Sequence, residues 1–288
     1  MASLKEIKSR IQSVKSTQKI TSAMKMVSSA KLRKAQKTIE NFFPYEQRLN
    51  GLLNNFLSAE EDNSSVFSEI REVKRVAIVV FSSNSSLCGG YNSNVSKLLA
   101  QTVEKYHKLG REHILIYPVG KKVAKACRKL GFEPEANFEE MAYKPNYAAT
   151  LSLSDELIEL FRNKDIDKVE LIYHHFASKS SQILKSETFL PIQLKPSQKG
   201  TVVLDYIVEP DRETIMNELI PKVLRLKIYT ALLDSNASEH AARTMAMQIA
   251  TDNATDILQE LSLQYNKSRQ QAITNELLDI VGGSFGQN

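Results

Sequence analysis

The sequence predicts an α/β domain that lies between two long helices of the coiled-coil type. Three observations support this. Residues 1–43 contain neither glycine nor proline, and the 60 residues from Lys222 to Val281 also lack both. Between these stretches, short apolar runs alternate with helical segments, a pattern typical of a mostly parallel sheet with covered faces. The chain has 288 residues, which is enough to bury a substantial core.

The N-terminal helix is predicted from a narrow apolar stripe. Its first members recur at spacings of three and four residues, the period of a helix with one buried face: Leu4, Ile7, Ile11 and Val14. Four further residues are expected to continue the stripe: Thr17, Ile20, Met24 and Val27. We assign this helix to residues 1–57 and a linker to residues 58–73.

The central domain is predicted from short runs that suit buried strands. The expected strands are Val76–Phe81, Ile114–Val119, Val169–Phe176 and, at the edge of the sheet, Ser181–Leu190. Helices are expected between them at Ser93–His107, Lys121–Lys129 and Ser154–Phe161. Glu139 and Glu140 are interpreted as part of a solvated loop. These elements place the α/β domain at residues 74–200.

The C-terminal helix is predicted from a charge-free seam sustained for more than seven heptads. Alternating steps of four and three residues select 16 positions, of which 11 are apolar and none carries Lys, Arg, Asp or Glu. Such a seam is typical of a coiled coil. The members are Leu219, Val223, Leu226, Thr230, Leu233, Ala237, His240, Thr244, Met247, Thr251, Ala254, Leu258, Leu261, Tyr265, Ser268 and Ala272. Residues 201–288 are therefore assigned to a connecting segment followed by this helix.

Positive charge is concentrated at the N-terminus. Residues 1–37 contain ten Lys and Arg side chains and one acid, Glu6, so they carry +9, while the other 251 residues sum to −4. A block of this kind suits an acidic partner, which could be nucleic acid, an anionic lipid surface or an acidic protein loop. An organellar transit peptide has a similar composition, but here lysine predominates and the helical pattern continues well past residue 30. No apolar run approaches the length of a membrane span.

Motifs for catalysis or ligand binding are missing from the sequence. It contains no phosphate loop and no G-x-G-x-x-G motif after the first strand. The loop at residues 84–90 could be a tight turn or a phosphate cradle, and the tight turn is favoured. His174 and His175 are adjacent in a predicted strand, so they point to opposite faces and cannot share a metal. Cys88 and Cys127 have no ligand spacing and are interpreted as buried free thiols. We therefore predict no catalytic, cofactor-binding or metal-binding residues.

Residues at both ends and in the middle of the chain carry a resemblance to a known family. The N-terminal helix reads LKEIKSRI at residues 4–11 and TQKIT at residues 17–21. The loop after the first strand reads LCGG at residues 87–90. The C-terminal helix reads SEHAAR at 238–243, ATDNA at 250–254 and YNK at 265–267. These motifs resemble the gamma subunits of F-type ATP synthases, most strongly over residues 1–45 and 205–285. Asn84, Ser85 and Ser86 depart from the family pattern, which usually has an acidic or small residue, a basic residue and glycine before Leu-Cys.

The resemblance implies a fold, a function and partners. The terminal helices would form an antiparallel coiled coil, and the central domain would be Rossmann-like. The chain would be the non-catalytic rotor shaft that couples ion flow through the membrane rotor to ATP synthesis at the beta subunits. Its partners would be the alpha and beta subunits, the epsilon subunit and the membrane c-ring, with no cofactor and no nucleic acid. It would lie peripherally on the cytoplasmic face of the bacterial inner membrane.

The resemblance also implies contact residues, which fall into four groups. A catch for beta-subunit loops would comprise Arg269, Gln270, Thr274 and Glu276. Other shaft contacts would be Lys8, Arg10, Met24 and Arg243. An apolar bearing tip would comprise Leu277, Leu278, Ile280 and Val281. The foot on the rotor ring would include Tyr206, Val208 and Glu209.

Two other functions fit parts of the pattern. A coiled-coil scaffold or adaptor protein with an α/β domain would account for the periodicity without the family motifs. A nucleic-acid-binding protein would account for the basic block, but the sequence lacks aromatic interleaving and a recognised binding motif.

Overall fold

The computed structural model describes residues 3–58, 66–192, 208–209 and 211–285. The chain divides into two compact units. One comprises Met1–Ser28 together with Thr244–Asn288, and the other comprises Ser29–Arg243. We refer to them as the coiled-coil unit and the α/β unit. In the described part of the chain, no helix is long and apolar enough to cross a membrane.

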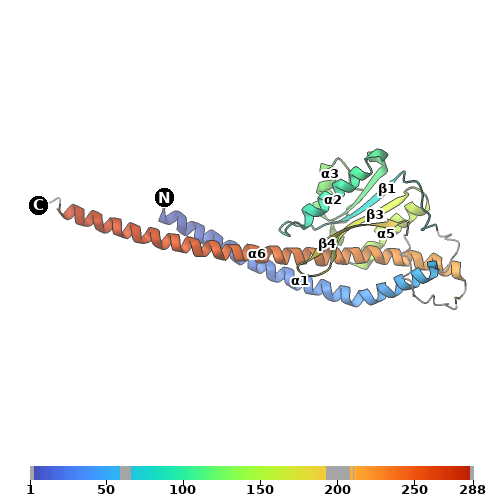
Figure 1. Ribbon diagram of the computed structural model, residues 1–288, viewed down its shortest axis with the longest axis horizontal. Coiled ribbons are helices and arrows are strands. Elements are labelled where there is room, and N and C mark those ends of the chain that lie inside the picture. Colours follow the sequence, from blue (N-terminus) through green and yellow to red (C-terminus); the bar gives the residue numbers. More distant parts are fainter. Residues whose placement is uncertain (1–2, 59–65, 193–207, 210, 286–288) are drawn as a thin grey trace. The chain divides into compact units, whose positions relative to one another are not determined.

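The α/β unit is built on a four-stranded sheet in the order β2-β1-β3-β4 (Figure 1). Its strands are β1 (Val76–Phe81), β2 (Ile114–Val119), β3 (Lys168–Phe176) and β4 (Gln182–Leu190). β1 is parallel to both β2 and β3, whereas β4 runs antiparallel to β3 at the edge. The predictions of a mostly parallel sheet and of its edge strand are confirmed.

One face of the sheet is covered by α2 (Tyr91–Lys105) and α3 (Lys121–Lys129). Their buried side chains pack against alternate residues of the strands. This layer includes Val76, Ile78, Val80, Val95, Leu99, Ile116, Val123 and Cys127. α3 has the bounds predicted from the sequence. α2 begins and ends two residues earlier than predicted.

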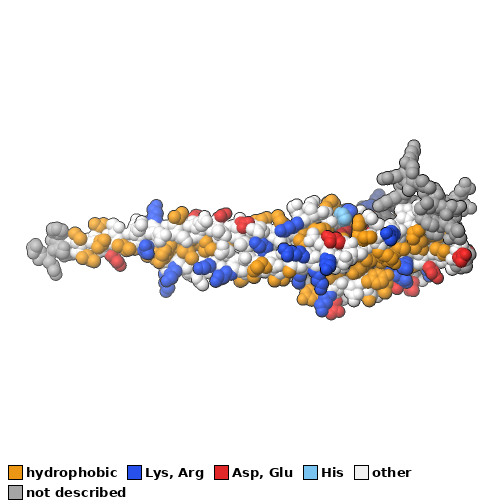
Figure 2. Space-filling model, turned by 90° about the horizontal axis from the view of Figure 1, so that it is seen from below, with side chains coloured by type: hydrophobic (Ala, Val, Ile, Leu, Met, Phe, Trp, Pro, Cys, Tyr) orange, Lys and Arg blue, Asp and Glu red, His pale blue; other side chains and the backbone are white. Residues whose placement is uncertain are grey.

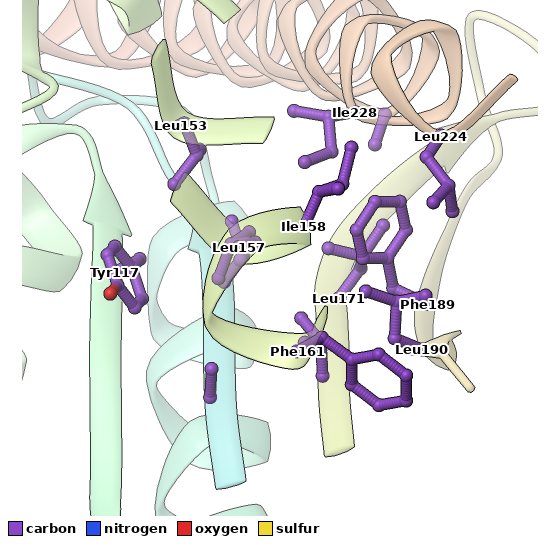
Figure 3. Close-up of a cluster of buried hydrophobic side chains, with 14 of the residues drawn as sticks. Tyr117, Leu153, Leu157, Ile158, Phe161, Leu171, Phe189, Leu190, Leu224 and Ile228 are labelled. Atoms are coloured by element: carbon purple, nitrogen blue, oxygen red, sulfur yellow. The ribbon is translucent and has the colours of Figure 1, made fainter. Parts of the chain in front are cut away.

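The opposite face packs against α5 (Tyr147–Arg162) and against the first part of α6 (Arg212–Phe285). Figure 3 shows Leu157 and Phe161 of α5 beside Leu171 of β3, with Leu224 and Ile228 of α6 near them. Each fully buried side chain of this size contributes about 1.5–3 kcal/mol. Because both faces are covered, β1 is buried at all six positions, which explains its uninterrupted apolar run.

Two local predictions in this unit need correction. α5 begins at Tyr147 rather than near Ser154, because Asn146 caps the helix by accepting a hydrogen bond from the backbone of Ala148 at 3.1 Å. Glu139 and Glu140 do not lie in a loop but begin the short helix α4 (Glu139–Tyr143). The α4 helix buries Met141 and Ala142. The prediction of a loop considered only the two charged residues and not the apolar pair that follows them. Two short 3-10 helices, η1 (His107–Leu109) and η2 (Arg111–His113), precede β2.

The coiled-coil unit pairs the start of α1 (Leu4–Ser58) with the end of α6. Gln18 Nε2 donates to Thr255 Oγ1 at 2.8 Å, and Thr251 Oγ1 donates to Thr21 Oγ1 at 2.8 Å. Because residue numbers rise along one helix as they fall along the other, the pairing is antiparallel, as expected. A third bond, from Lys25 Nζ to Gln248 Oε1 at 2.9 Å, keeps the same register.

The seam predicted for α6 is confirmed. All 16 of its positions are described, and each is buried or half-buried. In the coiled-coil unit Thr244, Met247, Ala254 and Leu261 are buried, while Ile249 between them is 56% exposed. The 3.5-residue spacing therefore locates the contact face even where its members are small or polar.

The stripe predicted for α1 is correct only in its first half. Ile7 is buried, but Ile20 and Val27 are 60% and 57% exposed. The buried positions that follow are Thr21 and Ser28. After Val14, the residues of α1 that face α6 are polar: Gln18, Thr21 and Lys25 form the hydrogen bonds to α6 described above. A stripe drawn through the apolar residues Ile20 and Val27 therefore selected the wrong face of the helix.

Candidate functional site

The loop after β1 is attached to α6 by a buried arginine. Arg243 Nη1 donates to the backbone oxygen of Ser86, and Arg243 Nη2 lies 2.7 Å from Glu239 Oε1 one turn earlier. The two side chains are only 8% and 11% exposed. Burial raises the pKa of Glu239, and the Arg243 guanidinium opposes this shift without cancelling it. Arg243 thus compensates a buried carboxylate and holds the loop on the helix.

A second polar contact joins α2 to α6 close to this loop. The Tyr91 hydroxyl lies 3.0 Å from the backbone oxygen and 2.6 Å from the Oγ of Ser235. The Tyr91 ring stacks on His174 of β3, with ring centroids 4.4 Å apart. Burial lowers the pKa of His174 to about 4, so this imidazole is neutral at pH 7. Tyr91 therefore connects the sheet, α2 and α6.

The loop itself is a tight turn, as the sequence favoured. Leu87 and Gly89 have positive φ angles of 68° and 59°, which close the turn before α2. Side chains on either side of the turn stabilise it. Ser83 Oγ donates to the backbone oxygen of Ser85 at 2.6 Å, and Asn92 Nδ2 on α2 donates to Ser83 Oγ at 2.8 Å. The side chain of Leu87 is 60% exposed at the tip of the turn.

Asn84, which departs from the family pattern, connects the loop after β1 to the first residues of α3 and α4. Its Oδ1 accepts from the backbone nitrogen of Lys121 at 2.9 Å, and its Nδ2 donates to the backbone oxygen of Glu139 at 2.7 Å. The amide supplies one acceptor and one donor, a combination that a carboxylate cannot provide. The structure thus gives Asn84 a role that the sequence left open.

The histidines and cysteines lie as predicted. His174 stacks on Tyr91, whereas His175 Nδ1 lies 2.6 Å from Asp234 Oδ2 on α6. Cys88 and Cys127 are both buried and free. Among the described residues, no group of three or more His, Cys, Asp and Glu could hold a metal ion.

The expected catch and bearing tip lie near the end of α6. Arg269, Gln270, Thr274 and Glu276 are all exposed, and Thr274 Oγ1 donates to the backbone oxygen of Gln270 at 2.9 Å. The tip residues are between 50% and 69% exposed: Leu277, Leu278, Ile280 and Val281. These surfaces are available for contact with another protein, but contact itself stays a prediction.

The other expected contact residues have different surroundings. Lys8 and Arg10 are exposed on α1, and Met24 is half-buried. Figure 2 shows Lys and Arg side chains spread along the surface of the helices. Arg243 is 7% exposed and makes its polar contacts within the chain, so a contact with another subunit stays a prediction for this residue.

The expected foot is only partly described. Glu209 is exposed, and Val208 packs against the larger core of the α/β unit. Tyr206 lies outside the described residues. Any contact of this segment with a rotor ring stays a prediction.

Comparison with known proteins identifies the family. A family model described as ATP synthase matches residues 3–285. The ATP synthase gamma chain of Phocaeicola vulgatus is 62% identical over 99% of this chain and 100% of its own length. The chain belongs to the ATP synthase gamma chain family. The gamma chain of Bacteroides fragilis (strain ATCC 25285) is similar as well, at 61% identity over the same shares of both chains.

Solved structures agree with this gamma-chain fold. A chain of the Euglena gracilis mitochondrial ATP synthase, in an OSCP/F1/c-ring structure, superposes with a TM-score of 0.67 at 20% identity. The match covers 98% of this chain and 94% of that one. A chain from the central stalk and c-ring of the Tetrahymena thermophila enzyme gives a TM-score of 0.57 at 22% identity, over 80% and 99% of the two chains.

Membership of the family decides between the functions that the sequence left open. A gamma chain is a non-catalytic subunit of ATP synthase. The scaffold alternative is therefore not favoured. The family match also agrees with the expectation that the chain is a non-catalytic subunit of the complex.

Proposed function

We propose that this chain is the rotating shaft of a bacterial F-type ATP synthase. It couples ion flow through a membrane c-ring to ATP synthesis at the beta subunits. Its partners are the alpha and beta subunits, the epsilon subunit and the c-ring. The complex holds it peripherally at the cytoplasmic face of the inner membrane. The observation that carries this proposal is the family match over residues 3–285, which includes both helices of the coiled coil.

The surface of the coiled-coil unit supports rotation inside a protein ring. The tip combines exposed aliphatic side chains that form no directional bonds, so its contact energy changes little as the shaft turns. Below it on α6, Arg269 and Glu276 offer charged groups that can form hydrogen bonds worth about 1.5–3 kcal/mol each to a partner loop. The tip would therefore act as a bearing and the residues below it as an orientation-dependent catch.

Coupling would arise because the shaft is asymmetric. Each orientation presents different side chains to the three beta subunits and so favours a different set of their conformations. A conformational equilibrium shifts only by the difference in contact free energy between its states. The basic surface near Lys8 and Arg10 would supply part of that difference against acidic beta-subunit loops.

The α/β unit supports torque transfer through its attachment to α6. Ile220, Leu224 and Ile228 are buried in the core shared with the sheet, and Arg243 fixes the loop after β1 to the same helix. A torque applied to the domain would therefore reach the helix through packed side chains rather than through a flexible joint.

Direct observation of rotation tests the proposal. The chain is assembled with the alpha and beta subunits of the same organism, and a bead is attached to a cysteine introduced at Lys125 on the exposed side of α3. ATP is expected to drive stepwise rotation in one direction. ATP hydrolysis by the assembled ring while the bead stays stationary would refute the proposal.

A further inference from the structure

A cavity of about 820 Å³ opens in the α/β unit at the amino-terminal ends of the parallel strands. Its lining includes residues 71–75, which lead into β1, and His113, which precedes β2. Lys164, Asp165 and Asp167, which precede β3, line it as well. It lies at the end of the strands opposite the loop that Arg243 holds. None of the functions described above involves it.

The lining of this cavity is rich in positive charge. Five of its residues are basic: Arg71, Lys74, Arg75, Lys108 and Lys164. Three are acidic: Glu72, Asp165 and Asp167. Asp167 Oδ2 already accepts hydrogen bonds from the backbone nitrogens of Lys74 at 2.8 Å and Arg75 at 3.0 Å. The backbone thus fixes this carboxylate at the start of β1, and the five basic side chains still outnumber the three acidic ones.

Arg71 is held rigidly at the wall of the cavity. Its Nη2 donates to the backbone oxygens of Phe161 at 3.1 Å and Ile166 at 3.3 Å, and its guanidinium stacks 4.4 Å above the Phe161 ring. These partners are neutral, and the nearest carboxylate oxygen, on Asp167, lies 4.0 Å from Nε. Within the described residues, Nε and Nη1 of Arg71 and Nε of Arg75 have no hydrogen-bond partner. An anion in the cavity would act on these charges at short range even without bonding to them.

Three lysines surround this fixed charge. The side chains of Lys74, Lys108 and Lys164 are exposed, and they make no ion pair or hydrogen bond with any other part of the chain that the structure describes. Lys74 and Lys164 lie in loops and Lys108 lies in η1, and all three line the cavity at the amino-terminal ends of the strands. A flexible ammonium group can approach a bound anion from each side, whereas the planar Arg71 stays in place.

We infer that this cavity binds a phosphate-bearing anion. Its volume lies within the range of about 300–1,000 Å³ that small-molecule sites occupy. Phosphate oxygens accept strong, charge-assisted hydrogen bonds from Lys and Arg, which are the side chains that converge here. The ligand could be a soluble nucleotide or pyrophosphate, or the headgroup of an anionic lipid. The inference goes beyond the shaft function, which needs no small ligand on this chain.

Binding measurements on the purified full chain test the inference. Calorimetric titration with pyrophosphate and ATP probes soluble ligands. Co-sedimentation with phosphatidylglycerol vesicles, compared with phosphatidylcholine vesicles, probes lipid headgroups. Lys74→Ser with Lys108→Ser removes two charges at the cavity. The matched control, Lys97→Ser with Lys125→Ser, removes two charges from exposed positions on α2 and α3.

At least one probe is expected to bind the unaltered chain. The cavity variant should weaken that binding about tenfold, and the control variant should change it by less than about twofold. Binding of soluble phosphates alone would identify a nucleotide-type site, and binding of phosphatidylglycerol vesicles alone a lipid site. Absence of binding to every probe, or equal weakening by the two double variants, would overturn the inference.

Discussion

The buried pair of Arg243 and Glu239 allows a sharp test of how the loop after β1 is held. We consider Arg243→Met, which keeps much of the volume but removes the charge. The substitution leaves Glu239 buried without a cation and leaves the backbone oxygen of Ser86 without its donor. The side chains of the pair are about one-tenth exposed, so water cannot replace these interactions.

The expected loss of stability can be estimated from these contacts. Removing one member of a buried ion pair costs about 3–5 kcal/mol when the remaining charge stays unpaired. Glu239 can escape part of this cost by taking up a proton, and each pKa unit corresponds to about 1.4 kcal/mol. Burial already raises its pKa in the intact protein, and loss of Arg243 would raise it further. A carboxyl group whose pKa is higher in the folded state destabilises the fold increasingly as pH rises above its unfolded pKa. We therefore expect a deficit of about 3 kcal/mol at pH 7 that shrinks towards pH 5.

Urea unfolding followed by circular dichroism measures this deficit. The matched control is Arg225→Met on the same helix, because Arg225 pairs with Asp155 at 2.6 Å but both side chains are more than one-third exposed. That change should cost less than about 1 kcal/mol. The double variant Arg243→Met with Glu239→Gln should recover part of the loss. A deficit for Arg243→Met below about 1 kcal/mol at pH 7, or one that does not change with pH, would refute the reasoning.

Three further predictions concern other parts of the chain. Burial opposes ionisation of Glu170, but bonds from Tyr106, Lys168 and Lys105 outweigh it and lower its pKa; Glu170→Gln should therefore cost about 1–3 kcal/mol at pH 7. The difference in unfolding free energy between the variant and the unaltered chain should become smaller as pH falls through the carboxyl pKa. Equal denaturation midpoints of the two proteins at neutral pH would contradict this. Arg269→Ala with Gln270→Ala should leave a complex that assembles but turns over ATP at least about tenfold more slowly; turnover at the wild-type rate would show that these side chains do not take part in coupling. Glu209→Lys should reduce proton pumping more than ATP hydrolysis, and if both stay intact, residue 209 does not lie on the rotor ring.

Periodicity explains why much of the fold could be predicted. The bounds of β1 and β2 follow from uninterrupted apolar runs, since strands covered on both faces have no polar side to interrupt them. The α6 seam follows from its 3.5-residue spacing, which persists through Thr244 and Thr251 although neither is apolar. For α1, the stripe was chosen by following apolar residues instead of the 3.5-residue spacing, and it selected the wrong face of the helix after Val14.

The candidate site was less predictable, because its contacts join residues far apart in the chain. Glu239 and Arg243 are spaced as helix neighbours, which was the one local signal of a buried pair. Nothing local indicates that Arg243 reaches Ser86 or that Tyr91 reaches Ser235. The cap at Asn146 and the bridging amide of Asn84 were missed for a similar reason, since polar residues in loops have many alternative partners.

The sequence by itself determined the element types, the strands, the seam of the C-terminal helix and the family to which the chain belongs. These depend on patterns within single segments, where burial of one face imposes a period. Only the tertiary structure decided which polar side chains are buried, which face of α1 meets α6 beyond Val14, and which basic loops meet around the cavity. Such pairings depend on where separate segments come together, and a buried charge or amide is stable only where that packing supplies its partner.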